Sequence, residues 1–173
     1  MTKALIVVDM QNDFVTGALG TKDAEEMLPR LVAKLEAAAA DSSTDIIFTQ
    51  DTHKENYFET QEGKNLPVAH CIKNTAGWEI VPELQKFIPR AKAVIEKKSF
   101  GSTRLPSLIK PYEIVEFVGV CTDICVVSNA LLVKAFYPEQ VVAVDANCCA
   151  GTSPEMHRAA LEVMRMCQCK IEE

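Results

Sequence analysis

The chain has 173 residues, 48% of them hydrophobic and 24% charged, which is enough for one domain with a substantial core. Its 18 basic and 24 acidic residues give a formal net charge of −6, so we expect no nucleic acid or membrane partner. No apolar run reaches transmembrane length, the N-terminus has no signal-peptide pattern, and the seven cysteines have no C-x-x-C spacing; together these favour free thiols in the cytoplasm.

Strands and helices alternate along the predicted chain. Continuous apolar runs predict buried parallel strands at residues 4–8, 44–49, 91–96, 113–118 and 141–144, with a sixth edge strand at 169–171. Apolar spacing predicts helices over residues 24–40, 78–88, 105–109, 122–136 and 153–166, of which the helix over 78–88 is interrupted early by Pro82. The polar stretch 52–69 is expected to be a functional loop. This order predicts one α/β domain over residues 1–173, a three-layer α/β/α sandwich around a mainly parallel sheet of five to six strands.

The segment 119–126 (GVCTDICV) joins the predicted fourth strand to the helix that follows it. We place Cys121 in the turn and Cys125 in the first turn of the helix, where the helix dipole favours a thiolate. Cys125 is therefore the candidate nucleophile. The alternative is that both cysteines are small buried hydrophobes, which is the commoner role of a free cysteine.

Three polar side chains follow the ends of different predicted strands, namely Asp9, Lys97 and Cys125. The carboxyl ends of parallel strands meet at one edge of a sheet, so we expect these groups to converge. A carboxylate can take the proton of a thiol, and an ammonium group stabilises both anions. The backbone N–H groups of Cys121 and Cys125 are the candidate oxyanion hole. A single polar residue at the end of a strand usually has no catalytic role. The combination of Asp9, Lys97 and Cys125, however, favours a catalyst that uses a cysteine.

A second group of polar residues has the spacing of metal ligands. Asp51 and His53 lie two residues apart after the second strand, and His70 follows in the same polar region. This combination suits a divalent ion with open coordination positions, and Glu62 is the candidate fourth ligand, either directly or through water. Cys71 is a weaker candidate than His70. The alternative is an ordinary polar surface loop.

Few aromatic residues are available to build a pocket. Phe14 follows Asp9 in the loop above the predicted sheet, and we favour a role in lining an apolar slot for a flat ring. The role of Trp78 is left open. His157 lies within the last predicted helix and is expected to be solvated or partly buried there.

The motifs together resemble those of the isochorismatase-like cysteine hydrolases, and among these the nicotinamidases most of all. The resemblance covers nearly the whole chain through the segments 4–14 (ALIVVDMQNDF), 51–53 (DTH), 67–71 (PVAHC), 96–102 (EKKSFGS) and 119–126 (GVCTDICV). It implies Asp9 as general base, Lys97 as its ion-pair partner and Cys125 as nucleophile. Lys98 offers an alternative register for the lysine, but the aromatic residue three positions after Lys97 favours Lys97.

The resemblance also implies features of the pocket. It implies a cis peptide bond between Val120 and Cys121, and substrate contacts from Phe14, Val120 and Cys121. One departure concerns the segment 66–69 (LPVA), which stands where many nicotinamidases have an aromatic residue and a Pro-Pro pair. The wall against the substrate ring is therefore expected to be built differently.

For the metal, the resemblance implies Asp51, His53 and His70 as ligands of Zn²⁺, with Mn²⁺ or Fe²⁺ as alternatives. The implied reaction is hydrolysis of nicotinamide to nicotinate and ammonia through a thioester, in NAD salvage. Two alternatives remain: hydrolysis of another small amide or carbamoyl substrate, and a non-catalytic thiol or metal-binding protein. A homo-oligomer is compatible with the sequence and is not required by it.

Overall fold

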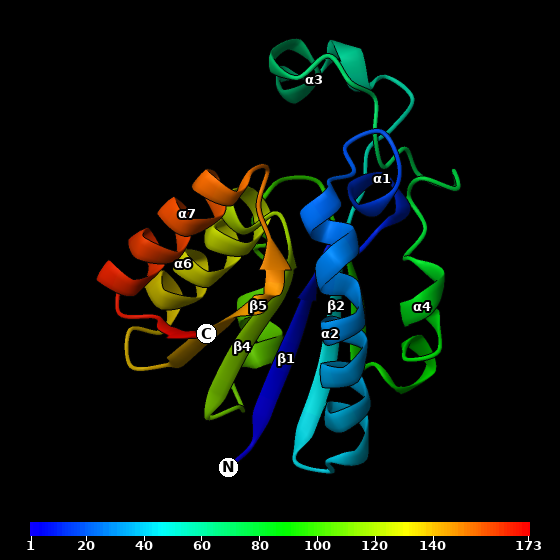
Figure 1. Cartoon of the computed structure of the whole chain (residues 1–173). Helices are drawn as coiled ribbons and strands as arrows, with labels where there is room; N and C mark the ends of the chain where they lie inside the picture. Colours follow the sequence, from blue (N-terminus) through cyan, green and yellow to red (C-terminus); the bar gives the residue numbers. More distant parts are fainter.

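The computed structural model describes all 173 residues and contains a six-stranded sheet in which every strand pair is parallel (Figure 1). The strands are β1 (Lys3–Val8), β2 (Thr44–Asp51), β3 (Ala93–Lys97), β4 (Ile114–Val120), β5 (Val141–Ala150) and β6 (Lys170–Glu172). The predicted α/β fold with a parallel central sheet is confirmed.

The helices vary widely in length. They are α1 (Asn12–Val15), α2 (Lys22–Ala40), α3 (Gln61–Asn65), α4 (Pro82–Gln85), α5 (Leu105–Ile109), α6 (Val127–Phe136) and α7 (Pro154–Met166), with short 3₁₀ turns η1 (Tyr57–Glu59) and η2 (Ile88–Arg90) and a π-helical turn η3 (Thr122–Val126). None of them combines the length and apolar character needed to cross a bilayer.

The sheet has the strand order β3-β2-β1-β4-β5-β6. The order reverses between the neighbouring strands β1 and β4, and ligands of open α/β sheets bind at the crevice above such a point. Gly119 faces Val8 across this junction and has a φ of +110°, and a Cβ atom there would collide with the carbonyl oxygen of Val8. Glycine is thus required where β4 approaches β1 most closely.

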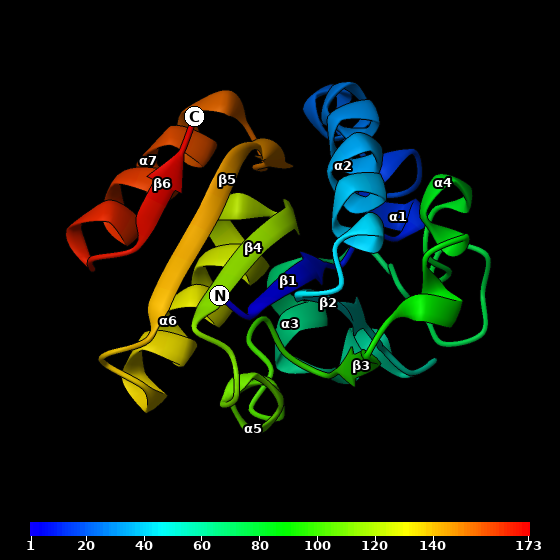
Figure 2. The same ribbon diagram turned by 90° about the horizontal axis from the view of Figure 1, so that it is seen from below.

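Two apolar clusters cover the two faces of the sheet (Figure 2). Alternate residues of β1, such as Leu5 and Val7, pack against α2 and the segments of α1 and α4. The intervening residues, such as Ile6, pack with α5, α6 and α7 on the other face. Because both faces are covered, β1 is buried from Ala4 to Val8, as its continuous apolar sequence predicts.

Two of the predicted elements differ in the structure. The helix predicted over residues 78–88, interrupted early by Pro82, is reduced to the single turn α4, which begins at Pro82. The fifth strand does not end before Asp145 but continues to Ala150, and its pairing with β4 shifts register between Phe117 and Gly119. This irregularity accommodates the polar residues Asp145 and Asn147, which lie beyond the end of the predicted strand. The loop 52–69 includes η1 and α3, and α3 projects above the sheet (Figure 1).

Candidate active site

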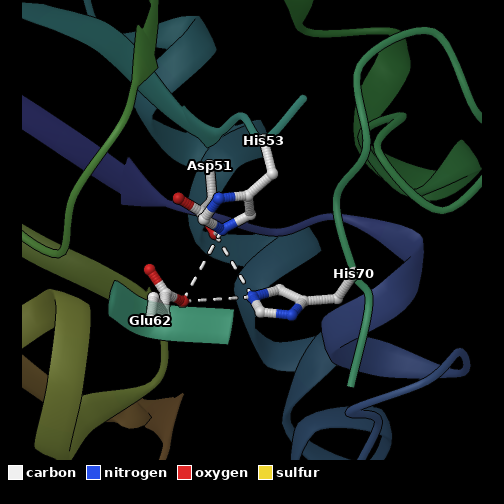
Figure 3. A group of neighbouring side chains, drawn as sticks. All are labelled: Asp51, His53, Glu62 and His70. Atoms are coloured by element: carbon white, nitrogen blue, oxygen red, sulfur yellow. Dashed lines mark hydrogen bonds and ion pairs between the residues drawn. The ribbon is translucent and has the colours of Figure 1, made fainter. Parts of the chain in front are cut away.

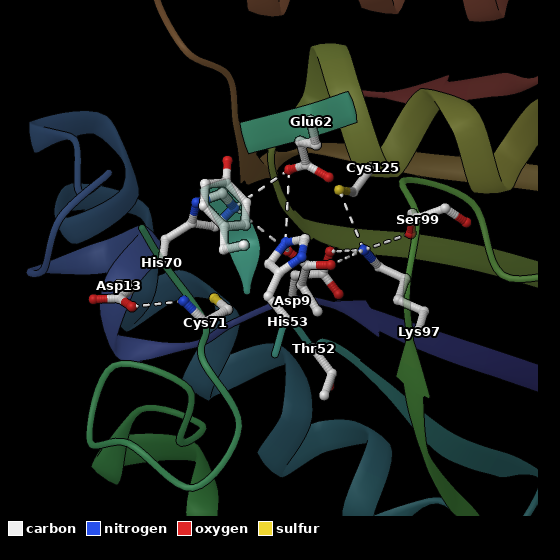
Figure 4. A network of polar contacts seen from close by, with 12 residues as sticks. Asp9, Asp13, Thr52, His53, Glu62, His70, Cys71, Lys97, Ser99 and Cys125 are labelled. Carbon is white, nitrogen blue, oxygen red and sulfur yellow. Dashed lines mark hydrogen bonds and ion pairs between the residues drawn. The ribbon is translucent and has the colours of Figure 1, made fainter. Parts of the chain in front are cut away.

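Three strand ends bring an acid, an amine and a thiol together above the β1–β4 junction (Figure 4). The Nζ atom of Lys97 lies 2.6 Å from Oδ2 of Asp9 and 3.4 Å from Sγ of Cys125. Asp9 directly follows β1, Lys97 is the last residue of β3, and Cys125 lies in η3 after β4. All three are buried. Lys98 is exposed, so only Lys97 reaches this position.

Hydrogen bonds fix the orientation of the acid and the amine. Thr49 Oγ1 donates to Asp9 Oδ1 at 2.7 Å, and Lys97 Nζ donates to the carbonyl oxygen of Ser99 at 3.1 Å. The other carboxylate oxygen, Asp9 Oδ2, is buried and forms the ion pair with Lys97 Nζ. Asp9 also has a φ of +49°, an uncommon left-handed conformation that aspartate tolerates better than most residues. Asp9 is thus held in a fixed orientation beside Lys97 and Cys125.

Burial is the largest influence on the pKa values of the acid and the thiol. Burial, together with the Asp9 carboxylate, raises the pKa of Cys125 well above its usual value despite the nearby ammonium of Lys97. Burial also raises the pKa of Asp9, against the opposing effect of Lys97. These effects oppose the helix dipole, and that the dipole favours a thiolate at Cys125 stays a prediction.

The segment that carries Cys125 begins with an uncommon peptide-bond conformation. The peptide bond between Val120 and Cys121 is cis, as the resemblance implied. Cys125 lies within the π-helical turn η3, and its carbonyl oxygen accepts a hydrogen bond from Asn129 Nδ2 at 2.8 Å. His157, predicted to be a partly buried helix residue, lies in α7 with Nδ1 2.7 Å from the hydroxyl of Thr122. That the N–H groups of Cys121 and Cys125 form an oxyanion hole stays a prediction.

Four potential metal ligands converge beside the acid–amine–thiol group (Figure 3). One ligand atom from each of Asp51, His53, Glu62 and His70 lies within 4.8 Å of all the others. His53 Nε2 lies 3.0 Å from Asp51 Oδ2, and His70 Nε2 lies 3.5 Å from Glu62 Oε1. Two imidazoles with two carboxylates form a donor set that suits Zn²⁺, Mn²⁺ or Fe²⁺.

The protonation of this group also fits a cation. His70 Nδ1 donates to the carbonyl oxygen of Val68 at 2.8 Å, which directs Nε2 toward the other ligands. Burial disfavours the charged imidazole, but the carboxylates of Asp51 and Glu62 outweigh this and raise the pKa of His70 to about 10. The site thus attracts positive charge, and a divalent ion would balance the two carboxylates.

Gln11 holds the backbone of Asp51 in place. Its side-chain oxygen accepts from the Asp51 N–H at 2.7 Å, and its nitrogen donates to the Asp51 carbonyl oxygen at 2.8 Å. The side chain is fully buried, and its nitrogen also donates to the carbonyl oxygen of Trp78 at 2.8 Å. The sequence analysis gave Gln11 no role, although it lies within the motif 4–14.

Asp13 has a similar role for the backbone next to His70, another member of the metal-ligand group. Its Oδ2 atom accepts from the backbone N–H of Cys71 at 2.8 Å, and Cys71 has a left-handed φ of +47°. This contact fixes the chain next to His70. Burial raises the pKa of the Cys71 thiol, and Cys71 is not among the converging ligand atoms, which agrees with its lower rank in the sequence analysis.

A cavity of about 610 Å³ connects the two groups. Cys121, Cys125 and Phe14 line it together with three of the potential metal ligands, and the ring of Phe14 lies 5.4 Å from that of His70. Val120 does not line the cavity; its side chain belongs to the apolar cluster that packs against α2. Trp78 does not line it either, because its indole donates to Thr52 Oγ1 at 2.9 Å. Leu66, the first residue of the segment 66–69, also lines it. No pocket role was predicted from the sequence for the other lining residues, which are Ala18, Leu19, Gly20, Thr21, Asn65, Phe100, Ile124 and Thr152.

Comparison with known proteins identifies the family. The model of the isochorismatase domain matches residues 3–172. The chain belongs to the isochorismatase family. A nicotinamidase/pyrazinamidase of Mycobacterium tuberculosis is 28% identical to this isochorismatase-family chain, over 94% of each chain. A probable inactive nicotinamidase of Arabidopsis thaliana is 27% identical, over 94% of this chain and 87% of the relative. The crystal structure of a pyrazinamidase of Pyrococcus horikoshii in complex with zinc is 29% identical, with a TM-score of 0.84 over 100% of this chain and 99% of the other.

Proposed function

We propose that this isochorismatase-family protein is a metal-dependent cysteine amidohydrolase that converts nicotinamide to nicotinate and ammonia in NAD salvage. The observation that carries the proposal is the position of Lys97 Nζ, 2.6 Å from Asp9 and 3.4 Å from the sulfur of Cys125. Cys125 lines the cavity that three of the potential metal ligands also line. The nicotinamidase relatives favour this amide over other substrates.

In the first half of the reaction, the sulfur of Cys125 attacks the amide carbon while Asp9 Oδ2 accepts the thiol proton. The carbonyl oxygen gains negative charge, and the backbone N–H groups of Cys121 and Cys125 stabilise it. The carbon–nitrogen bond then breaks. Asp9 returns its proton to the departing nitrogen, which leaves as ammonia, and the acyl group remains on the sulfur as a thioester. Lys97 stays protonated throughout, because Asp9, Cys125 and Asp51 outweigh the effect of burial and raise its pKa.

In the second half, Asp9 takes a proton from a water molecule whose oxygen attacks the thioester carbon. The carbon–sulfur bond breaks, the proton returns from Asp9 to the sulfur of Cys125, and the product leaves as nicotinic acid, which loses its remaining proton to water to give nicotinate. The buried environment of Asp9 suits this role, since a raised pKa brings a carboxylate closer to the operating pH of a general base.

Asp51, His53, Glu62 and His70 are the residues that would hold the metal. When bound there, a divalent ion supplies positive charge and a coordination position for the ring nitrogen of the substrate. The chain itself would orient the ring, since Phe14 and His70 have neighbouring rings and line the same cavity as Cys125.

Two alternatives differ from the proposal in measurable ways. Hydrolysis of another small amide or carbamoyl compound would use the same residues, and the segment 66–69 is the feature that favours it. A thiol-redox or metal-binding protein would need neither Asp9 nor Lys97, whereas both are buried against Cys125 here. All seven cysteines are free thiols, which also speaks against a disulfide between Cys121 and Cys125 in this state.

The test is release of ammonia and nicotinate from nicotinamide by the wild type, Cys125→Ala and Cys167→Ser, each with and without a chelator. Cys167 is exposed, so its substitution is a matched control. We expect turnover by the wild type and by Cys167→Ser, loss in Cys125→Ala, and a large decrease with the chelator. Turnover of other amides but not nicotinamide would favour the first alternative.

A further inference from the structure

Two exposed apolar side chains lie at the outer end of the catalytic cavity. Leu66, the residue after α3, is 37% exposed, and Phe100, in the loop after β3, is 46% exposed. Both line the cavity that also contains Cys125. When large apolar side chains line a cavity and are also exposed to solvent, a bound ligand can cover them and shield them from water.

Two further apolar residues line the same cavity. Leu19 and Ile124 pack against the apolar clusters on opposite faces of the sheet. The lining residues Asp51, Glu62 and His70 belong to the metal-ligand group, and the uncharged polar lining residues are Thr21, Asn65 and Thr152. The cavity therefore offers, besides the groups that suit the ring nitrogen of the substrate, apolar side chains that the proposed reaction does not use.

The volume of the cavity also leaves room for an apolar substituent beside the ring of the substrate. Cavities of about 300–1,000 Å³ commonly hold drug-sized ligands, and this one measures about 610 Å³. A single aromatic ring with a carboxamide group fills only part of that space. Filling the rest with apolar atoms would remove Leu66 and Phe100 from water, which is favourable.

We propose that Leu19, Leu66, Phe100 and Ile124 form an apolar subsite for a substituent of the substrate, so that aromatic carboxamides with an apolar substituent are preferred over nicotinamide itself. The inference rests on the proposed amidase function and names its substrate class. A hydrophobic pocket typically discriminates about 10- to 200-fold for one additional methylene group that it can accommodate. The substituent contacts the subsite in the ground state as well as during the reaction, so the gain appears mainly in KM.

The experiment compares kcat and KM for nicotinamide with those for nicotinamides that carry one propyl group, placed at each ring carbon in turn. We expect at least one propyl compound to exceed nicotinamide in kcat/KM by about 10-fold or more, mainly through a lower KM. In Leu66→Ser and in Phe100→Ser this ratio should fall toward one. Phe136→Ser is the matched control, since Phe136 is also an exposed phenylalanine (55%) but lies in the last turn of α6, outside the cavity.

A second measurement separates this inference from the proposed function. Calorimetric binding of the same compounds to Cys125→Ala reports the subsite without turnover. If nothing is hydrolysed but the propyl compound binds more tightly, the subsite stands and the amidase proposal fails. If nicotinamide is hydrolysed and no propyl compound exceeds it in either assay, the subsite is refuted.

One further result would also refute the apolar subsite. A second copy of the chain could cover Leu66 and Phe100 instead of a ligand. Light scattering at the assay concentration that shows a dimer in the wild type and a monomer in both serine variants would assign these side chains to an interface.

Discussion

Asp51 Oδ1 lies 3.4 Å from Lys97 Nζ, while the other oxygen of the same carboxylate lies 3.0 Å from His53 Nε2. One side chain thus belongs both to the metal-ligand group and to the surroundings of the catalytic amine. β2 and β3 are paired, and Asp51 faces Lys97 in their register, so the sheet itself fixes this contact. The occupancy of the metal site and the charge environment of Lys97 are therefore physically connected.

Replacing Lys97 by Met should abolish turnover. The substitution removes the only ammonium group beside Asp9, and breaking a buried ion pair costs about 3–5 kcal/mol because it leaves an uncompensated buried charge. We expect kcat/KM for nicotinamide to fall by about 1,000-fold or more, in line with the loss of one stabilising charge at an active site. Lys98→Met is the matched control, because Lys98 is exposed. Equal losses in the two variants would contradict the assignment of the lysine.

Removal of the metal should lower both stability and activity. An ion present at about 100 times its Kd stabilises a protein by about 2.7 kcal/mol, so dialysis against a chelator should lower Tm by several degrees. His53→Ala should likewise bind less metal, measured by elemental analysis. His157→Ala should retain the metal of the wild type, because His157 lies outside the ligand group. Unchanged metal content in His53→Ala would refute the proposed site.

The pH profile should show an acid limb caused by Asp9. Burial raises the pKa of this carboxyl, and only its ionised form can accept the thiol proton. Activity is therefore present above the pKa of Asp9 and is lost as the pH falls through it. We expect the acid limb of kcat/KM to lie above the ordinary aspartate value of about 3.9. Full activity down to about pH 4 would exclude Asp9 as the base.

Gln11→Ala should weaken metal binding without removing a ligand. The side chain makes two hydrogen bonds to the backbone of Asp51, and loss of such supporting contacts typically lowers metal affinity by about 10- to 100-fold. Competition with a chromophoric chelator measures the affinity. Gln85→Ala is the control, because Gln85 bonds only the carbonyl oxygen of Ile80. An unchanged Kd for the metal in Gln11→Ala would mean that the hydrogen bonds of Gln11 to the Asp51 backbone do not contribute to metal binding.

Much of the fold could be predicted because apolar runs mark the buried strands directly. The convergence of Asp9, Lys97 and Cys125 followed from one rule, that parallel strands end at a common edge. The interruption at Pro82 was visible in the sequence, but the helix predicted over residues 78–88 is still shorter than its apolar spacing indicates, since only Pro82–Gln85 is helical. The fifth strand was predicted too short because its irregular pairing tolerates Asp145 within it.

The properties of the site were harder to predict where they depend on the burial of a side chain or on contacts to the backbone. The raised pKa of Cys125 depends on its burial beside Asp9, which no local pattern of residues reports. Gln11 acts by bonding a backbone segment 40 positions away, so its role depends on the tertiary structure. Val120 illustrates the opposite error, since it is adjacent to a pocket residue in sequence but its side chain points into the core.

The central claim is that Cys125, served by Asp9 and Lys97, forms a covalent bond to the acyl group of an amide. The most direct measurement is peptide mass spectrometry of the enzyme after acid quenching during turnover of nicotinamide. The account predicts a nicotinoyl group on Cys125 alone, and none when Cys125→Ala is treated in the same way. Turnover with the acyl group on another cysteine, or ammonia release undiminished in Cys125→Ala, would contradict it.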